Sequence, residues 1–372
     1  METKNGRSTC TTDMIKKLDW YIIKKFLGTF LLSMVLIMAI AIIFDIQEKY
    51  DDFISNKAPL KAIILDYYVN FIPYYANMFS SMFVFISVIF FTSKMASNSE
   101  IIAMHSGGIS FHRFLVPYMI TATIIAVISW ILVLFVIPEA NKIRLDFEDK
   151  YVRNKFQNWE KNIHRQVRPG MFVYMESYNV DADNAFRFSI EKYEDGKLVS
   201  KLTSDYARWD SVNNKWIVYN YFIRDLRGPI EKHYKGANLD TACYLEAADM
   251  RMRDTYVEKM NIVELNKFID NQKLQGTDNI ERLMIEKYQR WALPFSTFIL
   301  TLMGVCLSNK KKRGGTVINI VVGTALCFTY ILMFQVSTTF TINLGFNPLI
   351  SVWMPNFLYA IICFFLYRKA TI

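Results

Sequence analysis

Residues 314–367 read GGTVINIVVGTALCFTYILMFQVSTTFTINLGFNPLISVWMPNFLYAIICFFLY and contain no charged side chain. As one continuous helix this stretch would be about 80 Å long, far more than the ~30 Å hydrocarbon core of a bilayer. Turn-forming residues are concentrated at 343–348, so we predict that the stretch crosses a membrane twice. Basic residues flank it at 310–313 and 368–369, and the positive-inside rule places both ends in the cytoplasm.

Four further charge-free runs precede this one, at 26–44, 67–93, 114–138 and 291–309. Each is long enough to cross a bilayer, so the sequence predicts six spans, three on either side of a polar segment. Lysines precede the first run and acidic residues follow it, which places the N-terminus in the cytoplasm as well. Pro73 lies inside the second run and predicts a kink there.

The composition agrees with spans plus a sizeable polar domain. The chain has 372 residues, of which 52% are hydrophobic, and a mean hydropathy of +0.16. Many residues behind the net charge of +9 lie beside apolar runs, where they orient the protein and face anionic lipid rather than nucleic acid. Three of the five cysteines lie in apolar runs, and Cys243 is alone in the polar middle, so no disulfide is expected there.

The first apolar run is longer than the hydrophobic region of a signal peptide, and no A-x-A-like site follows it, so we expect it to remain as a span. Residues 1–13 are polar and unpatterned. Met14 is a second candidate for the first residue, because the basic amphipathic opening begins at Ile15.

The polar segment 139–280 has the pattern of strands. Residues 172–175 are rich in strand formers, 186–190 alternate with period two, and Asp195-Gly196 is a hairpin turn. Strand-like pieces at 206–209 and 216–219 flank a turn at 213–214, and more follow at 243–258. We predict an antiparallel sandwich or roll, followed by a helix with apolar spacing at 262–269.

Motifs for catalysis are absent from the sequence. It contains no Walker loop, no H-E-x-x-H and no G-x-S-x-G, and its four histidines show no metal-ligand spacing. Charged residues inside the spans are scarce, which argues against an ion pump. We therefore predict no catalytic residues, no metal and no cofactor in this chain.

Residues 99–110, SEIIAMHSGGIS, predict a short cytoplasmic helix between the second and third spans. Ser97, Asn98 or Ser99 would cap it, Glu100 suits its first turn, and Gly107-Gly108 would end it. Two interpretations stay open from the residues alone, a docking helix for another protein and an ordinary solvated loop helix.

This segment resembles the coupling helix of the LptF/LptG lipopolysaccharide export permeases. Residues 18–26, LDWYIIKKF, resemble the amphipathic start of that family, and 286–294, EKYQRWALP, resemble the entry to its fourth span. The order of three spans, β domain and three spans matches too, so the resemblance covers nearly the whole chain. Gly107 and the N-terminal tail depart from the family pattern.

The resemblance implies a polytopic α-helical membrane protein with six transmembrane helices, 3 + 3, and an inserted periplasmic all-β jellyroll-like domain. It implies a location in a Gram-negative inner membrane and four kinds of partner: a paralogous LptF/LptG permease, an LptB-type ATPase dimer that binds the ATP, LptC/LptA-type periplasmic jellyroll proteins, and lipopolysaccharide. The chain is expected to divide into four parts. The first two are a tail and amphipathic start at 1–25 and spans one to three at 26–138, which include the coupling loop 94–113. The last two are the β domain with its trailing helix at 139–280 and spans four to six at 281–372.

Site residues follow from this resemblance and from the chemistry of a phosphorylated lipid. ATPase coupling falls on Glu100, Met104, His105 and Gly108. Head-group phosphates would be held by basic residues at the outer membrane edge, with snorkelling or pairing to Glu281 and Glu286 as the alternative. The candidates are Lys142, Arg144, Arg282, Lys287 and Arg290.

Acyl chains need an apolar path, because each methylene exposed to water costs about 0.8 kcal/mol. Candidate lining residues in the β domain, with plain core packing as the alternative, are Phe172, Tyr174, Phe186, Phe188, Trp209 and Trp216. Two other functions remain open, a membrane-anchored periplasmic adaptor or lipid sensor and the permease of another lipid or lipoprotein ABC exporter.

Overall fold

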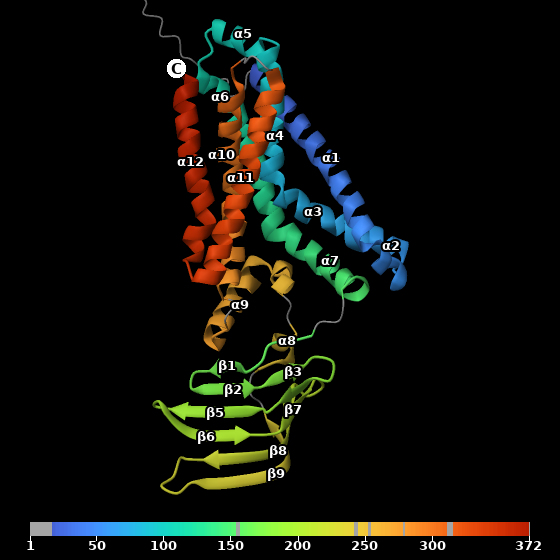
Figure 1. Ribbon diagram of the computed structural model, residues 1–372, viewed down its shortest axis with the longest axis vertical. Coiled ribbons are helices and arrows are strands. Elements are labelled where there is room, and N and C mark those ends of the chain that lie inside the picture. Colours follow the sequence, from blue (N-terminus) through green and yellow to red (C-terminus); the bar gives the residue numbers. More distant parts are fainter. Residues whose placement is uncertain are drawn as a thin grey trace, which may run out of the picture.

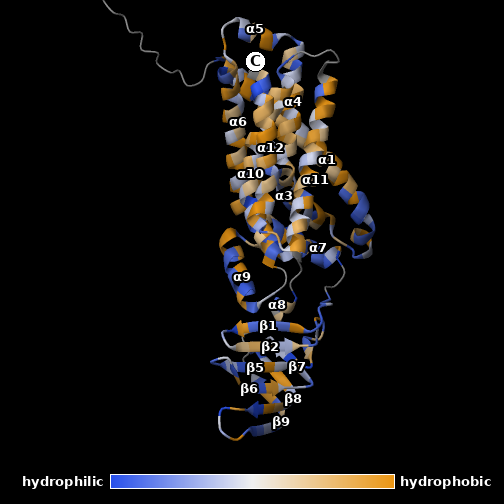
Figure 2. Ribbon diagram, turned by 60° about the vertical axis from the view of Figure 1, so that its left-hand side comes forward, coloured by the Kyte–Doolittle hydropathy of each residue, from blue (hydrophilic) through white to orange (hydrophobic). Residues whose placement is uncertain are grey.

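The structure is a computed structural model that describes residues 17–153, 157–241, 245–251, 254–277, 280–310 and 315–371. A bundle of long helices forms one end of the molecule and a β-sheet domain forms the other (Figure 1). Hydrophobic residues dominate the bundle, whereas the sheet domain and the helix that precedes α10 carry many hydrophilic ones (Figure 2).

Six helical segments among the described residues are long and apolar enough to cross a membrane, which confirms the six predicted spans. The turn at 343–348 is also confirmed, because α11 ends at Leu344, α12 begins at Pro348, and Gly345 between them has a φ of +67°. The third segment is continuous through a π-helical stretch, η2. The segments are α1 (Lys17–Ser55), α4 (Ser80–Ser97), α6 (Phe111–Ile131) with η2 (Leu132–Val136) and α7 (Ile137–Tyr151), α10 (Ile280–Ser308), α11 (Gly315–Leu344) and α12 (Pro348–Thr371).

The second apolar run is not one helix, which corrects the sequence prediction. Its first half belongs to a side arm made of α2 (Leu60–Ala62), the π-helical η1 (Ile63–Tyr68) and α3 (Val69–Met78). Pro73 lies inside α3, and the chain leaves helical geometry only at Phe79, with φ −96° and ψ 4°. Aromatic packing explains the arm, because Tyr67 and Phe71 are buried against α1 and α7 in one hydrophobic cluster.

The β domain is a single antiparallel sheet whose middle strand divides it into two arms. One edge of β8 pairs with β7 along its first half and with β6 along its second half, while β9 pairs with the other edge. One arm continues as β6-β5-β2-β1 and the other as β7-β4-β3. Both arms contribute to one core around Trp216, as expected for a roll. The strands are β1 (Ile163–Arg168), β2 (Met171–Met175), β3 (Ser177–Asn179), β4 (Asn184–Phe186), β5 (Ser189–Glu194), β6 (Lys197–Thr203), β7 (Tyr206–Asp210), β8 (Lys215–Asp225) and β9 (Lys232–Thr241).

Local turn chemistry fixes several of these boundaries. Asp195 and Gly196 have φ values of +51° and +76°, which confirms the predicted hairpin between β5 and β6. The predicted strand at 186–190 is wrong, because Arg187 has a φ of +47° and separates β4 from β5.

The described residues between β9 and α10 form helices joined by short non-helical stretches, without a strand. The strand-like pieces predicted at 243–258 are wrong for the described residues, which form α8 (Ala247–Met250) and the 3-10 helix η3 (Asp254–Lys259). Residues 243–244 and 252–253 lie outside the described ranges. The predicted helix at 262–269 is confirmed as α9 (Ile262–Gln275), which begins with a capping box between Asn261 and Glu264.

Candidate functional sites

The predicted cytoplasmic helix is present as α5 (Glu100–Ser106), at the end of the bundle far from the β domain (Figure 1). Its predicted side-chain cap is not formed, because Ser99 has a φ of +64° and makes no capping hydrogen bond. Its end is the predicted glycine pair. Gly108, at φ +85°, donates its N–H to the His105 carbonyl, and Ile109 donates to the Met104 carbonyl, which together form a Schellman motif.

Glu100 is held by the start of α1. The Tyr21 hydroxyl donates to Glu100 Oε2 at 3.0 Å, Lys25 Nζ lies 3.8 Å from the same oxygen, and Asn98 Nδ2 donates to Oε1 at 3.2 Å. The side chain nevertheless keeps 27% of its surface exposed. A carboxylate at the first turn of α5 is thus placed at the surface and oriented by two hydrogen bonds and one ion pair.

The apolar side of α5 packs onto the bundle. Ile101 is buried, and Met104 with Ile109 packs against the same core cluster. His105 is exposed, and its Nδ1 lies 2.8 Å from the Ile109 carbonyl oxygen. Of the four predicted coupling residues, the structure therefore leaves Glu100, His105 and Gly108 at the surface and uses Met104 to anchor the helix.

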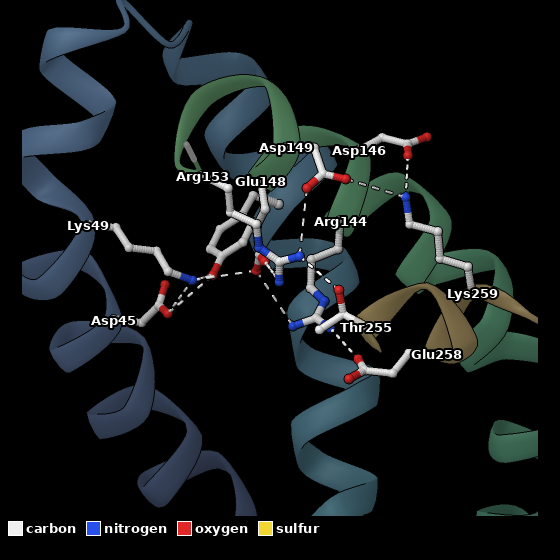
Figure 3. A network of polar contacts seen from close by, with 11 residues as sticks. Asp45, Lys49, Arg144, Asp146, Glu148, Asp149, Arg153, Thr255, Glu258 and Lys259 are labelled. Carbon is white, nitrogen blue, oxygen red and sulfur yellow. Dashed lines mark hydrogen bonds and ion pairs between the residues drawn. The ribbon is translucent and has the colours of Figure 1, made fainter. Parts of the chain in front are cut away.

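A charged network lies at the other end of the bundle, where α7 approaches the β domain (Figure 1), and its contacts are seen from close by in Figure 3. Its centre is Glu148 on α7, whose side chain is only 5% exposed. The carboxylate lies 2.5 Å from Arg153 Nη2, 3.5 Å from Lys49 Nζ and 3.7 Å from Arg144 Nη1. Lys49 also contacts Asp45 at 3.0 Å on α1. The network therefore joins α1 to α7 through ion pairs with little access to water.

The same network extends from α7 to η3. Arg144 Nη2 lies 3.1 Å from Glu258 Oε2, and Arg153 Nη1 donates to Thr255 Oγ1 at 2.9 Å. Lys259 contacts Asp146 at 2.6 Å. Burial raises the pKa of the Glu258 carboxyl, and the charge of Arg144 opposes that increase. Within the described ranges, no three His, Cys, Asp or Glu side chains are grouped in a way that could hold a metal ion.

A partly open cavity of about 270 Å³ lies beside this network, between α3, α4, α7, α10 and α11. Its wall is mostly apolar, and polar side chains gather where α7 and α10 meet η3. The polar wall residues there are Asn141, Glu258, Glu286, Gln289 and Arg290.

The five predicted head-group residues have different surroundings, although Arg144 and Arg290 both contact η3. Arg144 is buried in the network, and Arg290 is 6% exposed with its guanidinium donating to the Met260 and Val257 carbonyls and to Glu286. Lys142 pairs with Glu139 at 2.8 Å on an exposed face. Arg282 is exposed and Lys287 half-buried. Contact with a head group stays a prediction for all five.

The six predicted lining residues fall into two groups. Phe188 and Trp216 are fully buried and stack with centroids 5.4 Å apart, and Trp209 packs edge-on against Trp216. These three belong to the core of the β domain. Phe172 and Phe186 are 37% and 44% exposed, and the Tyr174 hydroxyl donates to Asn162 Oδ1. The structure does not align the six along one groove, and their role in lining a lipid path stays a prediction.

Sequence reasoning missed the network and the cavity. The local signal for the ion pairs is i, i+4 spacing, which is found for Asp45 with Lys49, Arg144 with Glu148 and Asp149 with Arg153. Nothing in the sequence marks the cavity, because its wall comes from segments far apart in the chain.

Comparison with known families gives one match of nearly full length. Residues 20–369 match the model of the family described as lipopolysaccharide export system permease LptF/LptG. Comparison with curated proteins finds no match.

Proposed function

The chain belongs to the LptF/LptG family of lipopolysaccharide export permeases, and from this premise we propose that it is the membrane subunit of an ABC transporter. In this proposal it extracts lipopolysaccharide from the outer leaflet of the inner membrane and passes it through its β domain towards the outer membrane. A separate LptB-type ATPase dimer binds the ATP and drives the cycle.

The observation that carries the ATPase role is the geometry of α5. A short helix, fixed to the bundle by Ile101 and Met104, presents Glu100 and His105 at the surface. Because α5 is anchored to the bundle on one side and exposed on the other, it suits a helix that transmits the movement of a docked protein to the spans.

The burial of the spans supports a pairing with a second permease. Within the chain, α1 and α11 are the least buried of the six candidate spans. Their apolar faces fit contact with a paralogous LptF/LptG permease and with lipid. The β domain, whose core is continuous across both arms, is the part proposed to pass lipid on to LptC/LptA-type jellyroll proteins.

Charge supports the proposed orientation. Lys25, Lys94 and Arg113 lie at the α5 end of the bundle, and Arg368 and Lys369 end α12 at the same side (Figure 1). By the positive-inside rule this end is cytoplasmic, which leaves the β domain in the periplasm.

The test is purification of the chain in mild detergent after co-expression with its transport partners, followed by mass spectrometry of bound proteins and lipid. Glu100→Ala is expected to lower ATPase recovery at least about tenfold, as a lost contact of about 1.4 kcal/mol would do. Glu139→Ala, an exposed acidic residue at the other membrane edge, is the matched control and is expected to recover the ATPase normally.

Two results would count against the proposal. Normal ATPase recovery and lipid export by Glu100→Ala would remove the role of Glu100. Wild-type chain that recovers neither a nucleotide-binding subunit nor lipopolysaccharide would instead indicate a periplasmic adaptor, and the transport function itself would be wrong.

A further inference from the structure

The cavity between α3, α4, α7, α10 and α11 lies within one chain and has two chemically different ends. Its volume of about 270 Å³ exceeds the ~150 Å³ of engineered apolar cavities that bind benzene, so it has room for an organic group. It is larger than ordinary packing defects, which are seldom bigger than a water molecule.

The apolar end lies towards the middle of the bundle. Leu293 stands about one helical turn beyond Arg290 on α10, which runs from the β-domain side towards the α5 end (Figure 1). The apolar wall residues beside Leu293 come from three helical segments, α4, η2 and α11. They are Met82, Val133, Cys327, Ile331 and Phe334. These apolar side chains suit hydrocarbon, and the polar residues among them, Ser81, Tyr330 and Gln335, carry no charge.

The polar end offers acceptors rather than cations. Three guanidinium nitrogens of Arg290 already donate to Met260, Val257 and Glu286. Glu286 and Glu258 contribute negative charge to the same wall. A phosphate here would meet two carboxylates and an arginine that already uses three of its five N–H groups.

At the polar end, the side chain of Asn141 lacks a hydrogen-bond donor for its oxygen. Its side chain is fully buried, and its Nδ2 donates to the Glu258 carbonyl at 3.2 Å. Its Oδ1 is buried without a hydrogen-bond partner. Leaving a buried acceptor unpaired is unfavourable, so a ligand that donates a hydrogen bond at this position would recover the lost energy.

We propose that this cavity is a binding site for one acyl chain that carries a hydroxyl or amide N–H, with the donor at Asn141 and the hydrocarbon between Leu293 and Ile331. The inference rests on the proposed function, because it names the part of the transported lipid that a single permease chain holds. The phosphates of the same lipid then bind elsewhere.

The experiment uses the full chain in its transporter complex, reconstituted in bilayers of phosphatidylethanolamine and phosphatidylglycerol. Three long-chain probes carry a diazirine at the chain end and differ only at the polar end, which is a hydroxyacyl amide, a hydrocarbon without a donor, or an alkyl phosphate. After irradiation without ATP, mass spectrometry maps the labelled peptides.

We expect the amide probe to label the α10 and α11 peptides around Leu293 and Ile331, at least fivefold more than the phosphate probe does. Leu293→Trp fills the apolar end and is expected to reduce this labelling at least fivefold. Ile361→Trp, at a position of α12 that is 59% exposed, is the matched control and is expected to leave it unchanged.

A second pair of variants keeps the test valid if the tryptophan disturbs the fold. Asn141→Leu is expected to reduce labelling by the amide probe but not by the donor-free probe. Asn141→Gln keeps both the acceptor and an amide donor for the Glu258 carbonyl and is expected to label normally. Equal labelling by the phosphate probe, or normal labelling of both Leu293→Trp and Asn141→Leu, would overturn the proposal. Because labelling needs neither ATP nor export, these outcomes differ from a failure of the transport function, which shows as missing ATPase and lipid.

Discussion

Glu148→Gln tests whether the charged network holds together the ends of α1 and α7 that lie away from α5. The carboxylate is 5% exposed and lies 2.5 Å from Arg153 Nη2 and 3.5 Å from Lys49 Nζ. Removing one partner from a buried ion pair costs about 3–5 kcal/mol. That range is an upper limit here, because Lys49 keeps Asp45 and Arg144 keeps Glu258 as acidic partners. Hydrogen bonds to charged groups contribute about 1.5–3 kcal/mol, so we expect a loss of about 2 kcal/mol.

Equilibrium unfolding in mixed micelles, followed by tryptophan fluorescence, measures this loss. A change of about 2 kcal/mol lowers the folding constant roughly 30-fold. Glu139→Gln is the control on the same helix, because Glu139 is 66% exposed and its pair with Lys142 is a surface ion pair. Such pairs contribute about 0–1 kcal/mol, so the control is expected to unfold close to the wild type.

The reasoning would be refuted if Glu148→Gln unfolded with the same midpoint and slope as Glu139→Gln. That outcome would mean that the remaining acidic residues compensate fully for Glu148. A double-variant cycle with Arg153→Gln gives an independent check, because two residues in direct contact are expected to show a coupling energy of about 1 kcal/mol or more.

Two further predictions concern the β domain. Gly170→Ala is expected to destabilise it by about 3 kcal/mol, because Gly170 has a φ of +75° and a Cβ there would overlap the Tyr193 carbonyl oxygen. Gly196→Ala is the control, at a similar φ but in open space, and is expected to cost only about 1 kcal/mol. Equal shifts of the melting temperature in the two variants would contradict this reasoning. Burial raises the pKa of Asp249, so the folded state binds its proton more tightly than the unfolded chain and stability falls as pH rises from the ordinary value of 3.8 through the raised one. Asp249→Asn is expected to remove this fall in thermal unfolding measured between acidic and neutral pH, and an unchanged pH dependence would count against it.

Structural features that are determined by neighbouring residues in the chain could be predicted from the sequence. The spans follow from charge-free runs, and the turn before α12 follows from a glycine and a proline within 343–348. Asp195-Gly196 specified a hairpin because both residues accept a positive φ. The end of α5 at Gly107-Gly108 has the same kind of local cause.

Features decided by packing could not be predicted in this way. Asn77, Ser80 and Ser81 flank Phe79, but the run there stays free of charge and the break was not predicted. The helix breaks at Phe79 because the arm formed by η1 and α3 packs its aromatic side chains against α1 and α7. Arg187 is not a residue type that marks a turn, yet it takes a positive φ between two strands. Lys49 and Glu148 are about a hundred positions apart, so their contact has no local signal in the sequence.

Arg290 shows why the chemistry of a residue type alone did not identify its role. A basic residue at a membrane edge is a reasonable candidate for binding phosphate, but a guanidinium also carries five donors in a fixed fork. The short helix η3 ends beside α10 and leaves backbone carbonyls that need donors, and Arg290 donates to those of Val257 and Met260. This clamp holds η3 against α10, and it thereby places Glu258 beside Arg144 and at the polar end of the cavity. The charge of Arg290 is thus used to position the acidic groups around it, which is why the cavity presents acceptors although an arginine lies in its wall.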